Sequence, residues 1–157
     1  MSFLSNRSHS RELNHLDNRP IVFIDSQLSN CDFLVQKVAF QARAIVINSH
    51  ADGIKAITYE LERSNCQEIH IITYGFPGCL YLGSSELSIN TFIQYTKELK
   101  NWFKGDRSSF APPRIFLYGC NVAAGDVGEE FISRLSQITT AEITALTNIV
   151  NSNILNN

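Results

Sequence analysis

The chain has 157 residues, of which 44% are hydrophobic and 18% are charged, and its net charge is −2. This length suits one domain with a sizeable core, and the apolar content excludes a disordered or collagen-like chain. Because 13 Lys and Arg face 15 Asp and Glu, we expect no nucleic-acid partner. No apolar run approaches the roughly 20 residues of a membrane span, and the N-terminal segment lacks the apolar core of a signal peptide. A cytoplasmic location is therefore expected for the chain as it stands.

Short apolar runs alternate along the chain with segments of helical periodicity. Residues 1–19 are polar and predict a mobile tail. Strands are predicted at 21–24, 44–47, 68–73, 114–118 and 141–146. Helices are predicted within 26–39, from an Asp52 cap through Leu61, from a Ser88 cap through Phe103 with Ile93 facing inward, and around 127–135. A small hairpin arm is predicted at 80–83, and a frayed end at 151–157.

The predicted strands are continuously apolar, which is typical of parallel strands covered by helices on both faces. With right-handed crossovers, the alternation predicts a three-layer α/β/α sandwich with a mostly parallel sheet over residues 20–150. A flavodoxin-like strand order, 2-1-3-4, is expected.

Ligand and catalytic groups of an open parallel sheet collect in the loops beyond the carboxyl ends of the strands. Here those loops begin at Asp25, His50, Tyr74 and Cys120. Gly119 permits a tight exit from the fourth strand, so that the Cys120 thiol lies at the rim beside the next helix, where backbone N–H groups stabilise a thiolate. The alternative is a buried rim cysteine without reactivity. Two roles are open for Asp25: lining a pocket for a basic side chain, or capping the helix that follows.

The four cysteines form no CxxC pair and no cluster with histidine at the spacing of metal ligands. We therefore expect no metal and no cofactor. Each cysteine outside the rim, Cys79 included, is interpreted as a small buried side chain. Phe76 and Tyr81 either form an apolar rim to a groove or cover the edge of the sheet.

The stretches ITYGFPGCLYLGSSELS and IFLYGCNVAAGDVGEEFISRLSQIT resemble a caspase-like domain of unknown function, family 4347 of clan CD. Such domains occur in large bacterial, notably cyanobacterial, surface and secreted proteins. IVFID and VINSHADGIKAITYEL fit as well, so the resemblance covers residues 21 to about 147. It implies a caspase-like fold and a cysteine–histidine dyad, in which a Gly-Cys follows the fourth strand and a His-Gly follows the third. The cysteine carries over to Cys120, whereas Tyr74 stands at the position of the histidine.

The replacement of the histidine by Tyr74 determines which function we expect. A phenol with a pKa of about 10 is a poor acceptor for a thiol proton, so Tyr74 is interpreted as an inactive substitute. His70 lies four residues upstream and is expected to be a hydrogen-bonded core residue. His50 lies three strand spacings, roughly 14 Å, from the fourth strand in the expected order. His9 and His15 belong to the tail.

The sequence therefore predicts a degenerate caspase-like pseudopeptidase that binds or scaffolds a protein or peptide partner, rather than an enzyme. The expected groove takes an extended segment by strand addition. Its residues are predicted to be Asp25, Gly75, Phe76, Gly119 and Asn121. Two alternatives remain open: a self-processing cysteine peptidase that uses Cys120 with a non-standard base, and a redox-responsive thiol module of Cys120 and Cys79.

Overall fold

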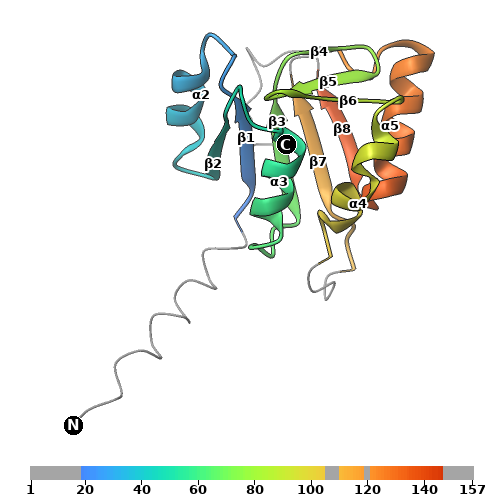
Figure 1. Cartoon of the computed structure of the whole chain (residues 1–157). Coiled ribbons are helices and arrows are strands. Elements are labelled where there is room, and N and C mark those ends of the chain that lie inside the picture. Colours follow the sequence, from blue (N-terminus) through green and yellow to red (C-terminus); the bar gives the residue numbers. More distant parts are fainter. Residues whose placement is uncertain (1–18, 105–109, 119–120, 147–157) are drawn as a thin grey trace.

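A computed structural model describes residues 19–104, 110–118 and 121–146. Five strands form one sheet in the order β2-β1-β3-β7-β8, and every neighbouring pair is parallel (Figure 1). The strands are β1 (Ile21–Asp25), β2 (Arg43–Ile47), β3 (Glu68–Ile72), β7 (Arg114–Tyr118) and β8 (Glu142–Leu146). The predicted parallel sheet and its flavodoxin-like order are thus confirmed.

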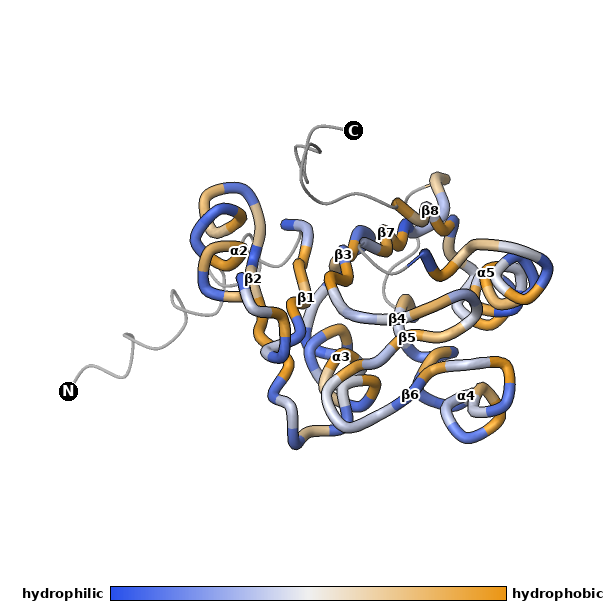
Figure 2. The backbone as a smooth tube through the Cα atoms, turned by 90° about the horizontal axis from the view of Figure 1, so that it is seen from above, coloured by the Kyte–Doolittle hydropathy of each residue, from blue (hydrophilic) through white to orange (hydrophobic). Residues whose placement is uncertain are grey.

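Helices cover both faces of this sheet, which confirms the three-layer sandwich. The helices are α2 (Cys31–Val38), α3 (Gly53–Leu61), α4 (Phe92–Asn101) and α5 (Gly125–Thr139). In Figure 2, α2 lies on one side of the sheet, and α3, α4 and α5 lie on the other. Alternate residues of each central strand feed two separate cores: Phe23 and Ile71 pack on the three-helix side, whereas Val22 and Ile72 pack on the side of α2.

A second, three-stranded antiparallel sheet lies at the carboxyl end of the large one (Figure 1). We call it the hairpin sheet; it consists of β4 (Gly75–Phe76), β5 (Cys79–Leu82) and β6 (Ser85–Ser88). Its inner face contributes Leu80, Leu82 and Leu87 to the core of the three-helix side. The predicted hairpin arm is therefore present, and it is longer than the sequence indicates.

Two expectations about the helices are wrong, and one of the two roles left open for Asp25 is excluded. The helix predicted to begin at Ser88 begins at Phe92 instead, because Ser88 pairs with Cys79 in the hairpin sheet and the chain turns at Thr91. Ile93, predicted to face inward, is 83% exposed. Asp25 does not cap the helix that follows it, since residues 26–30 form turns and the N-cap of α2 is Asn30.

The cap expected at Asp52 is confirmed. Its side chain accepts hydrogen bonds from the backbone N–H groups of Ile54 and Lys55, and α3 begins at Gly53.

Candidate functional site

Asp25 lies at the carboxyl end of β1, and its buried carboxylate is hydrogen-bonded to the backbone of the hairpin sheet. The residue is only 1% exposed. Its Oδ1 accepts from the backbone N–H of Gln27 at 2.8 Å, and its Oδ2 accepts from the backbone N–H of Gly83 at 2.7 Å. Both oxygens are therefore engaged by backbone donors inside the fold, and the second contact joins residues 58 positions apart in the chain.

The loop after β2 contacts the turn between β5 and β6, in which Gly83 and Ser84 lie. The carbonyl oxygen of Ala51 accepts from the N–H of Ser84 at 2.8 Å, and Asp52 and Gly83 form an isolated antiparallel bridge. Gly83 has a φ of +61°, and a Cβ atom there would lie 2.2 Å from the Ala51 oxygen. Only glycine fits this close crossing of two backbones.

Tyr74 leaves the end of β3 and opens the hairpin sheet, as the strand pattern predicts. It is 50% exposed. Its carbonyl oxygen accepts from the N–H of Tyr81 at 3.0 Å, and the hydroxyl of the preceding Thr73 donates to the Tyr81 carbonyl. Gly75, the first residue of β4, then pairs with Leu80 of β5. The backbone around Tyr74 is thus fixed, while its side chain reaches solvent.

The loop before α5 approaches the hairpin sheet from the other side. The N–H of Gly78 donates to the carbonyl oxygen of Val122 at 2.8 Å. Asn121 is exposed and has a φ of +48°, a left-handed conformation that asparagine tolerates better than most residues. Gly119 and Cys120 lie outside the described residues, and the expected neighbourhood of Tyr74 and Cys120 stays a prediction.

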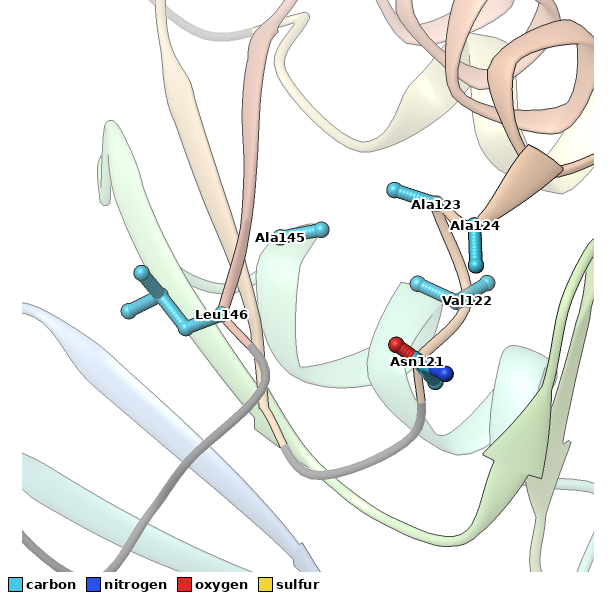
Figure 3. Close-up of a pocket in the computed structure, with 6 residues that line it drawn as sticks. All are labelled: Asn121, Val122, Ala123, Ala124, Ala145 and Leu146. Carbon is cyan, nitrogen blue, oxygen red and sulfur yellow. The ribbon is translucent and has the colours of Figure 1, made fainter.

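A pocket of about 180 Å³ opens between this loop and the end of β8. In Figure 3 the methyl groups of Ala123 and Ala145 point toward each other across it, and Leu146 points away. The remaining described residues that line it are Asn121, Val122 and Ala124. Its described lining is uncharged and mostly apolar, which suits a small aliphatic group better than an ion.

His70 is the centre of a buried polar chain along β3 and β7. It is 2% exposed; its Nδ1 lies 2.8 Å from the Tyr118 hydroxyl, and its Nε2 lies 2.9 Å from Oε1 of Glu68. The other carboxylate oxygen of Glu68 accepts from Arg114. The imidazole ring stacks on Phe116 with a centroid distance of 4.7 Å. The hydrogen-bonded core histidine that the sequence predicts is confirmed.

The hydrogen bonds of this chain have a defined direction. Because a carboxylate only accepts, the Nε2–H of the neutral ring donates to Glu68, and Nδ1 accepts from the Tyr118 O–H. Burial lowers the pKa of His70, although the neighbouring Glu68 carboxylate partly opposes this. Burial, with a further contribution from Glu68, raises the pKa of Tyr118 to about 12. Both groups are therefore neutral near pH 7.

Neither of the two described histidines lies at the carboxyl end of β3, where Tyr74 follows, or of β7. His50 is exposed and follows β2, which β1 and β3 separate from β7. At about 4.8 Å per strand, that separation is roughly 14 Å. His70 precedes Tyr74 by four residues and has both ring nitrogens engaged. Cys79 is buried at 2% exposure.

Among the described residues, no three His, Cys, Asp or Glu side chains are grouped so that they could hold a metal ion. In the same part of the chain, no helix combines the length and apolar character needed to cross a membrane.

The sheet order, the strand-end loops and the hairpin sheet together define a doubly wound α/β domain whose candidate site lies at the carboxyl edge. Residues 21–156 match the family model described as a domain of unknown function (DUF4347). The chain therefore belongs to the DUF4347 family. No curated protein and no solved structure matches it.

Replacement of Asp25 by asparagine should lower the free energy of unfolding by about 2–3 kcal/mol. The amide keeps the volume, but its NH₂ group faces a backbone donor where the carboxylate accepted, so one buried N–H loses its partner. Urea unfolding measures the loss. Asp32→Asn, at an exposed site in the first turn of α2, is the matched control and should change stability by less than about 0.5 kcal/mol. Equal stability of the two variants would contradict the role given to Asp25.

Proposed function

We propose that this domain is a degenerate, caspase-like pseudopeptidase that binds a protein segment without cutting it. The placement of the described histidines carries the proposal. His70 is fixed in the core by Glu68 and Tyr118, and His50 lies three strand spacings from β7. Tyr74 occupies the position where the caspase-like pattern has its histidine, and a phenol is a poor base near pH 7.

Two features support binding of an extended segment. β8 is an edge strand: within the described residues no strand pairs with its outer side, which is the side that strand addition would use. Beside it, a hollow of about 520 Å³ runs between α5 and β8, lined among others by Ile132, Ser136 and Ile143. Ala123 lines both this hollow and the smaller pocket at the strand ends. A bound strand along β8 would therefore reach the candidate site.

Purified wild-type protein should hydrolyse no member of a peptide library, and Tyr74→His should move it toward activity more than any other single change. An imidazole at position 74 would supply a base for the Cys120 thiol, and a positioned base contributes about 10²–10⁴-fold to a rate. Cleavage products are measured by mass spectrometry, and alkylation by iodoacetamide reports the reactivity of the thiol.

Cys120→Ala is the control for this experiment. Cleavage by the wild type that disappears in Cys120→Ala would overturn the pseudopeptidase proposal in favour of a working cysteine peptidase with an unusual base. Faster alkylation of Cys120 in Tyr74→His than in the wild type would support the proposed pairing of the two positions. An unchanged alkylation rate would contradict that pairing.

A further inference from the structure

Three half-exposed aromatic side chains lie near the start of the hairpin sheet: Tyr74 just before β4, Phe76 in β4 and Tyr81 in β5. Tyr74, Phe76 and Tyr81 are 50%, 49% and 40% exposed. The rings of Phe76 and Tyr81 lie 5.7 Å apart at an interplanar angle of 59°. The Tyr81 N–H bond to the Tyr74 carbonyl places these two residues opposite each other. The opposite face of the hairpin sheet is buried, so the aromatic groups gather on its outward face.

A carboxylate completes this group. Glu86 lies directly opposite Tyr81 in the β5–β6 ladder and is exposed. Partial burial, together with the nearby Cys79 and Glu86, raises the pKa of Tyr81, which fits the closeness of the two side chains. None of the ion pairs between described residues includes Glu86. We call Tyr74, Phe76, Tyr81 and Glu86 the aromatic face.

The surroundings of the aromatic face carry negative charge. Residues 73–96 and 115–133 contain no Lys or Arg, whereas the second range contains Asp126, Glu129 and Glu130. The two segments meet where Gly78 lies against Val122 and Val127. Asp126 is exposed and lies in the first turn of α5, next in the chain to the Val127 that contacts Gly78. A cationic occupant matches this charge.

We propose that the aromatic face binds an arginine or lysine side chain of an extended partner segment, with the cation against the Phe76 and Tyr81 rings and its charge near Glu86. Aromatic faces attract such cations, and the planar guanidinium of arginine also stacks on them. This inference rests on the proposed binding function and names the chemistry of its partner. Because Tyr74 belongs to the same face, the cationic residue would lie beside the candidate site.

The test compares two peptide pools that differ in one charge. Ac-Xaa₄-Arg-Xaa₄-NH₂ and the same pool with citrulline, the neutral isostere of arginine, are titrated into ¹⁵N-labelled wild-type protein. We expect the arginine pool to shift the amide signals of Gly75, Phe76 and Tyr81, and to bind about fivefold to tenfold more tightly than the citrulline pool. Equal shifts by both pools, shifts confined to other parts of the molecule, or no shifts would each overturn the inference.

Variants assign the effect to the aromatic face. Glu86→Gln should remove most of the arginine preference and leave citrulline binding unchanged, and Phe76→Ala should weaken arginine binding by a similar factor. Phe40→Ala, at a residue 92% exposed beyond α2, is the control and should bind as the wild type does. An arginine preference that survives in both Glu86→Gln and Phe76→Ala would contradict the assignment.

Mass spectrometry of the same pools separates this inference from the proposed function. Cleavage that depends on Cys120 would overturn the pseudopeptidase proposal, while a charge preference that depends on Glu86 would still support the aromatic face. Absence of cleavage together with equal binding of both pools would overturn the inference alone.

Discussion

Gly83→Ala is expected to lower the free energy of unfolding by about 3 kcal/mol or more. A left-handed φ costs a residue with a Cβ atom about 1–2 kcal/mol, and Gly83 has a φ of +61°. The new methyl group would also lie 2.2 Å from the Ala51 carbonyl oxygen and 2.7 Å from that of Asn48. Both contacts are with backbone, so a loop has to move. Chemical denaturation followed by circular dichroism measures the loss.

Gly125→Ala separates the two contributions to that loss. Gly125 has a φ of +66°, but no atom outside its immediate neighbours lies within 4 Å of a Cβ built there. We therefore expect Gly125→Ala to lower the free energy of unfolding only by the cost of the left-handed φ, about 1–2 kcal/mol. If Gly83→Ala were no less stable than Gly125→Ala, the backbone oxygens of Asn48 and Ala51 would not be as close to position 83 as the structure places them.

The large sheet could be predicted from the sequence because its signals are local. Each strand is a short apolar run such as Ile21–Asp25 or Arg114–Tyr118, and helical periodicity directly follows β1, β2 and β7. Right-handed connections then leave few possible arrangements. The same reasoning gave Asp52 as a cap, since the residues it caps are two and three positions away.

The hairpin sheet was only partly predictable, since long-range contacts determine how it is held. Asp25 and Gly83 are joined by a hydrogen bond across 58 positions, which no local pattern indicates. Without that contact, an aspartate after a strand is most simply interpreted as a helix cap. Ser88 was misassigned for a related reason: its pairing with Cys79 outweighs its preference for a helix N-terminus.

In the candidate site, too, the features set by local sequence were predictable and those set by contacts between distant residues were not. The strand pattern correctly placed Asp25 and Tyr74 at the carboxyl edge, and the position of His70 within a strand correctly made it a core residue. The pairing of Tyr81 with Glu86 was missed, although an aromatic residue and a carboxylate on either side of the turn at Gly83 were a usable signal. Cys120 lies outside the described part of the chain, so its predicted role stays a prediction.

Acidification below about pH 6.5 should destabilise the protein, and His70 should cause much of the loss. The pKa of His70 is lowered in the folded state, so the unfolded chain binds its proton more readily. Stability is therefore complete above the ordinary histidine pKa of about 6.5 and falls as the pH decreases toward the lower, folded-state value. Each unit of difference between the folded-state and unfolded-state pKa values of His70 corresponds to a loss of about 1.4 kcal/mol in the free energy of unfolding. Urea unfolding at pH 7.5, 6.5 and 5.5 measures the slope.

Two histidine variants decide the origin of that slope. His70→Phe keeps a ring stacked on Phe116 and removes the titrating group, so it should flatten the profile between pH 7.5 and 5.5 even though it loses stability at pH 7.5. His50→Gln alters an exposed histidine and should keep the wild-type slope. Protonation of His70 would also give Nδ1 a hydrogen, turning the acceptor of the Tyr118 hydroxyl into a donor. A profile that is unchanged in His70→Phe would place the acid sensitivity elsewhere, whereas a flattened profile would show that His70 is the group whose protonation destabilises the fold.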